Sequence, residues 1–84
     1  MGKGEKRLAH MRDNPRGDWT IEDVEVVCRA YDIVLEKRSG GSHWGVFHSR
    51  AGIQTIPCHR RIKAVYIKAF VRFVDKATGA SHGD

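Results

Sequence analysis

The feature that most limits the fold of this chain is a series of three short strand-forming segments between residues 33 and 57. These segments are rich in β-branched and aromatic residues, which favour strands. Turns that contain glycine separate them, and connections this short join neighbouring antiparallel strands. The sequence therefore predicts a three-stranded antiparallel meander. The predicted strands cover residues 33–37, 43–48 and 53–56, with turns at residues 39–42 and 49–52 and a stop at Pro57.

Amphipathic segments with helical spacing flank the predicted meander. Thr20 followed by Asp23 is a variant of the capping box, and the apolar residues after it predict a helix over Ile21–Tyr31. A second helix is predicted from about Lys63 to Lys76, with one apolar side and one basic side. A further short helix over Gly4–Asp13 carries few apolar residues, so we expect it to dock weakly or to fray.

The predicted order of elements is helix, three strands, helix, with an extra N-terminal helix. This is an α+β arrangement in which both amphipathic helices cover one face of a small sheet and leave the other face open. It is the α-β-β-β-α layout of the double-stranded-RNA-binding domain. The 84 residues suffice for one domain. We assign residues 1–18 to an N-terminal arm, residues 19–77 to the domain and residues 78–84 to a flexible tail.

Composition indicates a chain that works in the cytoplasm. The first six residues are polar and lack the apolar stretch of an export signal. Cys28 and Cys58 are therefore expected to be reduced thiols. No apolar run approaches the roughly 18 residues that a membrane helix requires, so we expect no membrane partner.

Positive charge is concentrated in the second half of the chain. Residues 1–31 are balanced, whereas residues 37–76 contain nine basic side chains and a single acidic one, Asp75, for a net charge of +8. Such a field favours a polyanion, and nucleic acid is the commonest polyanion of the cytosol. The alternative is a basic surface that serves solubility alone.

His43 is the first candidate for chemistry. It follows a glycine-containing loop at the start of the second predicted strand, and glycine lets a backbone approach a ligand closely. Histidine exchanges protons near neutral pH, and RNA cleavage needs proton transfer plus positive charge near the phosphate. His48 lies five positions further on, so an unbulged strand turns it to the opposite face. His59 is a candidate for phosphate binding or for a second acid–base group.

Other chemistries are less well supported by the sequence. Cys58, His59, His43 and His48 are zinc-type ligands, but their spacing contains no paired C-x-x-C or H-x-x-x-H element. No activating base for Cys58 as a nucleophile is identifiable. Aromatic side chains stack on bases in some RNA-binding proteins, but we expect those of this chain to serve the core, with only Trp44 partly exposed. The aromatic residues concerned are Trp44, Phe47 and Tyr66.

One string of motifs resembles the HicA family of bacterial toxins. The family typically shows a Gly-Ser-His step on its second strand, a Val/Ile-Pro step at the end of its third, and then a helix. The corresponding residues here are Gly41-Ser42-His43-Trp44, Val46-Phe47-His48, Thr55-Ile56-Pro57-Cys58-His59-Arg60-Arg61-Ile62-Lys63 and the helical run Val65–Val71. The resemblance covers about residues 20–76. Many family members have a second histidine or another polar or aromatic residue where this chain has Trp44, and the N-terminal arm is longer than in the shortest members.

The resemblance implies a double-stranded-RNA-binding-like fold, cleavage of mRNA and neutralisation by a HicB-type antitoxin. It assigns the catalytic role to His43. Acid–base chemistry at the phosphate requires no metal in principle, so we expect no cofactor. A non-catalytic RNA-binding module with the same fold remains the alternative, and a module that binds only an acidic protein is a third reading. We expect RNA contacts from Lys37, Arg38, Ser42, Trp44, His59, Arg60, Arg61 and Lys63.

Overall fold

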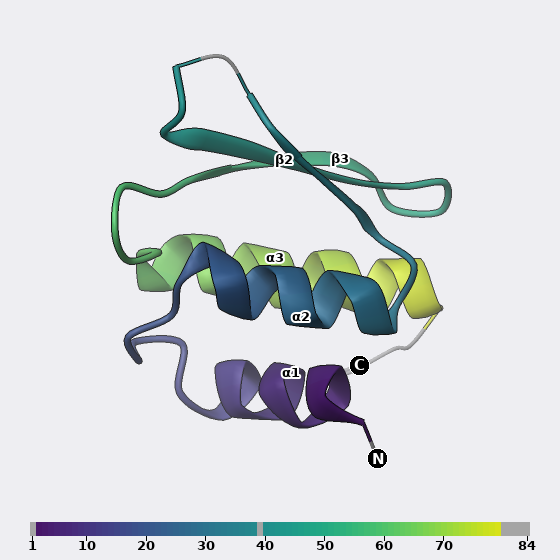
Figure 1. The fold of residues 1–84 in the computed structure, drawn as a ribbon. Coiled ribbons are helices and arrows are strands. Elements are labelled where there is room, and N and C mark those ends of the chain that lie inside the picture. Colours follow the sequence, from purple (N-terminus) through teal and green to yellow (C-terminus); the bar gives the residue numbers. More distant parts are fainter. Residues whose placement is uncertain (1, 39, 80–84) are drawn as a thin grey trace.

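The three predicted strands form one antiparallel sheet in the order β1-β2-β3, and three helices complete an α+β fold (Figure 1). This computed structural model describes residues 2–38 and 40–79. The predicted fold class and order of elements are confirmed. The elements are α1 (Lys3–Asp13), α2 (Ile21–Ala30), β1 (Val34–Lys37), β2 (His43–His48), β3 (Gly52–Pro57) and α3 (Ala64–Thr78).

The elements are arranged in three layers. The sheet is one layer, α2 and α3 lie side by side against one of its faces, and α1 lies on the far side of these two helices (Figure 1). The core between the layers includes Phe70 and Ile67 of α3, Val24 of α2 and Ile56 of β3, all fully buried. None of the helices in the described part of the chain combines the length and the apolar character that a membrane span requires.

Most predicted boundaries hold to within one or two residues. The Thr20 backbone N–H donates to the Asp23 carboxylate at 2.9 Å, which completes the predicted capping box of α2. Strand β3 includes Pro57, where the sequence had placed the stop. Helix α3 runs on to Thr78 and ends at Gly79, which has a left-handed backbone conformation with φ of 76°. Thr78, the first residue of the predicted tail, therefore belongs to the helix. Residues 80–84 lie outside the described part.

The expectation that the N-terminal helix docks weakly was wrong. Met11 is fully buried and Leu8 is 6% exposed, so both belong to the common core. Gly4 lets α1 approach α2 closely, because a methyl group at this position would lie 2.3 Å from the Ala30 Cβ atom. Arg12 donates two hydrogen bonds to Asp75 of α3, at 2.7 and 2.9 Å. Two well-buried apolar residues and tight backbone contact replace the broad apolar face that the sequence lacks.

The sheet leaves one face open, as predicted. Residues alternate between the two faces of each strand, and the fully buried Val46 of β2 marks the face that the helices cover. His43, Gly45 and Phe47 of β2 therefore project to the open face. The paired strands continue these positions into rows, since Phe47 pairs with Val34 and Ile53 and Gly45 pairs with Glu36 and Thr55.

Candidate functional site

His43 is exposed and begins the middle strand of the open face. The preceding loop turns through Gly40 and Gly41, whose φ angles of 94° and 76° favour glycine over residues with a side chain. The Ser42 hydroxyl lies 3.3 Å from the Nδ1 atom of His43, within hydrogen-bonding distance. Loop and hydroxyl together hold the imidazole at the start of the middle strand, where a large ligand can reach it.

Two hollows lie beside the strand neighbours of His43, although His43 itself lines neither. Arg38 donates its backbone N–H to the His43 carbonyl at 2.8 Å on one side, and Pro57 pairs with His43 on the other. Arg38 lines a hollow of about 270 Å³ on the open face of the sheet. Pro57 lines a cavity of about 720 Å³ at the end of the molecule.

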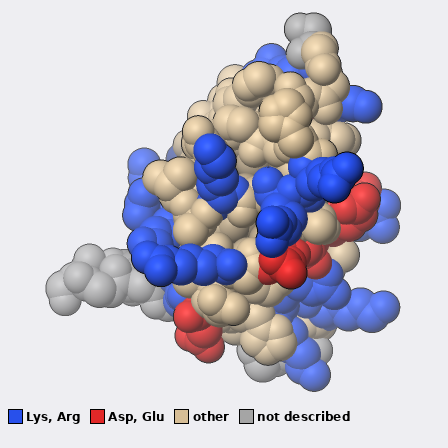
Figure 2. Space-filling model, turned by 90° about the vertical axis from the view of Figure 1, so that its left-hand side faces the viewer, with Lys and Arg blue, Asp and Glu red and all other residues tan. Residues whose placement is uncertain are grey.

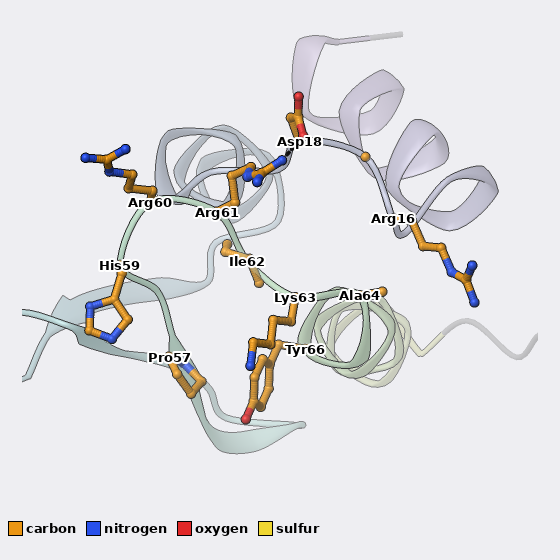
Figure 3. A pocket seen from close by; sticks show the side chains of 11 residues that line it. Arg16, Asp18, Pro57, His59, Arg60, Arg61, Ile62, Lys63, Ala64 and Tyr66 are labelled. Carbon is orange, nitrogen blue, oxygen red and sulfur yellow. Dashed lines mark hydrogen bonds and ion pairs between the residues drawn. The ribbon is translucent and has the colours of Figure 1, made fainter.

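The larger cavity, which we call the end cavity, lies where the loop after β3 meets the segment between α1 and α2. The Ile62 backbone N–H donates to the Trp19 carbonyl at 2.8 Å and joins these two segments. Four of its eleven lining residues are Lys or Arg, and Figure 2 shows Lys and Arg side chains crowded over this end of the molecule. Its lining residues are Arg16, Gly17, Asp18, Pro57, His59, Arg60, Arg61, Ile62, Lys63, Ala64 and Tyr66 (Figure 3).

The structure brings together some of the residues predicted to contact RNA and separates others. Four of them line the end cavity: His59, Arg60, Arg61 and Lys63. Arg38 lies on the open face beside His43. Lys37 and Trp44 pair across β1 and β2 on the helix-covered side, where the Lys37 ammonium lies 5.8 Å from the centre of the Trp44 ring.

One arginine of the end cavity is paired with an acid. Arg61 donates to the Asp18 carboxylate at 2.7 Å, and the two side chains are 70% and 81% exposed (Figure 3). An ion pair this exposed contributes little to stability. Its main effect is on charge, because Asp18 offsets one of the positive charges that line the cavity.

The remaining candidates for chemistry are separated from His43. His48 lies on the opposite face of β2, and its Nδ1 atom accepts a hydrogen bond from the Arg50 backbone N–H at 3.1 Å. Cys58 is buried, and this burial raises the pKa of its thiol despite a hydrogen bond from the Ile21 backbone. A raised pKa disfavours the thiolate, which is the nucleophilic form. Within residues 2–38 and 40–79, no three His, Cys, Asp or Glu side chains are grouped to hold a metal ion.

Phe47 departs from the expectation that the aromatic residues would serve the core. Its side chain is 46% exposed on the open face, whereas Trp44 is partly buried against the core. The exposure of Phe47 was predictable from its spacing of four residues from His43, since this spacing places both residues on the same face of an unbulged strand. The sequence does not indicate that Arg16 lines the end cavity, because only the tertiary fold places it in one cavity wall with Arg60 and Lys63.

Comparisons with known proteins give no match: no family model, no curated protein and no solved structure matches the chain.

Proposed function

We propose that this protein is a ribonuclease of the HicA type that cleaves mRNA, with His43 as its acid–base group. The observation that carries the proposal is the position of His43, exposed on an open sheet face, with Arg38 bonded to its carbonyl on one side and Pro57 of the end cavity paired with it on the other. A histidine exposed on an open sheet face suits a long, flexible substrate better than a small molecule. The resemblance of Gly41-Ser42-His43-Trp44 to the family motif supports the same assignment.

The proposed reaction is an internal transfer at phosphorus. The 2′-oxygen of a ribose forms a bond to the adjacent phosphorus, the bond to the 5′-oxygen of the next nucleotide breaks, and a cyclic phosphate is left. His43 takes the proton of the 2′-hydroxyl or supplies one to the leaving 5′-oxygen, and water completes the other transfer. The contact from Ser42 engages Nδ1, so Nε2 is the nitrogen that serves the RNA. Arg38 stabilises the charge that grows on the phosphate.

The end cavity supplies the affinity for the RNA backbone. His59, Arg60, Arg61 and Lys63 line one open cavity next to Pro57, the strand partner of His43. Phosphates bound there lead the chain across His43 toward the open face. Three further residues have supporting roles in this scheme. Ser42 positions the imidazole of His43. Lys37 and Trp44 contact each other and support the strand that carries His43.

The proposed partner is an acidic antitoxin of the HicB type that covers the open face and the end cavity, in the cytoplasm. Masking positive charge would block the approach of RNA. This part of the proposal rests on the family resemblance and on the charge of residues 37–76.

The test is RNA degradation by the purified protein in the presence of EDTA. We expect His43→Ala to lower the cleavage rate by about 100-fold or more and to leave RNA binding intact. His48→Ala is the matched control, because this histidine faces the other side of β2. Equal cleavage by His43→Ala would remove His43 from the mechanism. Salt-dependent binding by the native protein without cleavage would favour the alternative, a non-catalytic RNA-binding module.

A further inference from the structure

The smaller hollow has an unusual position, in the middle of the open sheet face. Gly45 lies at the centre of the middle strand and pairs with Glu36 on β1 and Thr55 on β3. The Arg38 side chain occupies the space above Gly45, and a hollow of about 270 Å³ lies beside the two residues. The hollow is two residues along β2 from His43. We call it the sheet hollow.

An apolar row closes one end of the sheet hollow. Phe47 is 46% exposed, and its strand partners Val34 and Ile53 are 50% and 63% exposed. Single exposed apolar residues are ordinary, but a continuous row across three strands indicates a contact surface. The aromatic ring of Phe47 stands in the middle of this row and offers a stacking surface for a flat ligand.

Charged groups line the rest of the sheet hollow. The Arg38 side chain lies over Gly45, because a methyl group at Gly45 would be 2.8 Å from the Arg38 Nε atom. Glu36 is exposed beside it on the same face. No ion pair with Glu36 occurs in the described part of the chain. The hollow therefore combines a ring, a guanidinium and a free carboxylate.

The negative charge of Glu36 is unfavourable on a surface that serves only to attract phosphate. Glu36 is the single acidic residue between positions 33 and 74, and a carboxylate repels a polyanion. Its position in a hollow next to an aromatic ring suits recognition of a hydrogen-bond donor instead. An ionised carboxylate only accepts hydrogen bonds, and its two oxygens match two neighbouring donors.

We propose that the sheet hollow binds a guanine base of single-stranded RNA, an inference that rests on the proposed function. Phe47 stacks on the base, and the Glu36 carboxylate accepts hydrogen bonds from N1–H and the 2-amino group. Guanine is the one standard base with two adjacent donors on its pairing edge. Adenine and cytosine place a donor beside an acceptor, and uracil places one donor between two acceptors. Arg38 binds the phosphate between this base and His43.

The experiment measures the binding of short RNA oligonucleotides to the full chain that carries His43→Ala, so that the RNA stays intact. The oligonucleotides contain adenine, cytosine and uracil, with one central position as guanine, inosine or adenine. We expect affinity to fall in that order, because inosine keeps N1–H and lacks the 2-amino group. Phe47→Ala is expected to weaken binding of the guanine oligonucleotide about tenfold, from the loss of one stacked base. Phe47→Trp is expected to retain it.

Glu36→Gln gives the sharpest readout. It is expected to abolish the preference for guanine and at the same time to strengthen binding of the guanine-free RNA, since one negative charge is removed.

Val65→Ala is the matched control for Phe47→Ala, because it also removes an exposed apolar side chain and Val65 is 62% exposed on α3. It is expected to leave both affinities unchanged.

The outcomes distinguish failure of the guanine site from failure of the ribonuclease proposal. Cleavage of RNA by the native chain with no base preference, or with a preference that survives Glu36→Gln, overturns the guanine site and leaves the ribonuclease proposal standing. Guanine-selective binding without cleavage overturns the ribonuclease proposal and leaves the guanine site standing. RNA affinity unchanged by Phe47→Ala also overturns the guanine site. Absence of any RNA binding at low salt overturns both proposals.

Discussion

Arg38 lies across the backbone of Gly45, so that an added methyl group would meet its Nε atom at 2.8 Å. The neighbouring atom belongs to a flexible side chain, which can move away. We therefore expect Gly45→Ala to change the free energy of unfolding by less than about 1 kcal/mol, since alanine fits a strand at least as well as glycine. RNA affinity should fall severalfold, because Arg38 is displaced and the sheet hollow is filled.

Binding titrations and urea unfolding of the same variant check this prediction. Arg38→Ala and the double variant complete a cycle. If Gly45→Ala acts through Arg38, the two substitutions together cost less RNA affinity than the sum of their separate effects. Strictly additive losses would contradict that account.

The pairing of Asp18 with Arg61 predicts a variant that binds RNA more tightly. Asp18→Asn removes the carboxylate that offsets Arg61 in the end cavity. RNA affinity at low salt is expected to rise severalfold, and its dependence on salt is expected to steepen, because one more basic group is available to phosphate. Stability should change by less than about 1 kcal/mol, since the pair is exposed.

Asp13→Asn is the control, because it removes the same charge at the end of α1, away from the cavity. Affinity measured over a range of salt concentrations distinguishes the two variants. An equal gain in both would show that net charge alone matters and would contradict a specific role for the cavity.

The contact between Ser42 and His43 predicts an effect on turnover. Ser42→Ala removes the hydroxyl that lies 3.3 Å from Nδ1. A hydrogen bond of this kind contributes about 1 kcal/mol, so we expect kcat to fall severalfold with little change in KM. Ser42→Thr keeps a hydroxyl and should restore most of the rate. A loss confined to KM would show that Ser42 binds RNA and does not position the imidazole.

Close packing of α1 on α2 predicts that Gly4→Ala destabilises the protein. Helix propensity alone predicts a gain of up to about 1 kcal/mol. The added methyl group would instead lie 2.3 Å from the Ala30 Cβ atom and 2.8 Å from the Val26 carbonyl oxygen. We expect a net loss of about 1–3 kcal/mol in urea unfolding.

Ala30→Gly removes one of these two clashes, so adding it to Gly4→Ala should recover part of the loss. A Gly4→Ala variant more stable than the native protein would show that the two helices do not pack as described.

Burial of Cys28 predicts a loss of stability at alkaline pH. Burial, with a smaller effect of Glu25, raises the pKa of this thiol to about 12. In the unfolded chain a cysteine titrates near 8.5, so above that pH the unfolded state binds fewer protons than the folded state. Stability is therefore complete below about pH 8 and falls as pH rises toward 12, by about 1–2 kcal/mol at pH 10 from this group.

Urea unfolding at pH 7 and pH 10 measures the effect. Cys28→Ala lowers stability at both values, because it leaves space in the core. Its stability should nonetheless decline less between them than that of the native chain. An identical decline would assign the pH dependence to other groups.

Much of this fold could be predicted because its elements carry strong local signals. The reciprocal contacts of Thr20 and Asp23 cap α2, as their spacing predicted, and β2 spans His43–His48 as expected. The docking of α1 could not be predicted in the same way. Its two buried apolar residues, Leu8 and Met11, form too narrow a stripe to signal a buried helix, and the closeness that Gly4 permits depends on where Ala30 lies.

The candidate site was predictable in part. The exposure of His43 and its separation from His48 follow from strand alternation, which the structure preserves. The grouping of Arg16 with Arg60 and Lys63 could not be foreseen, because it depends on how the segment before α2 meets the loop after β3. The sequence predicts a core position for Phe47, because a thin domain needs its aromatic residues there. In this chain Phe70 and Phe73 of α3 supply that need.

The unbulged course of β2 has a consequence for the products of the proposed enzyme. His43 and Phe47 stand on one rigid strand, about 13 Å apart at the usual rise of about 3.3 Å per residue. The strand therefore fixes the distance between the base that is recognised and the bond that is cleaved. Every break should fall at one fixed offset from a guanine. A residue inserted between the two positions would turn them to opposite faces and abolish this register.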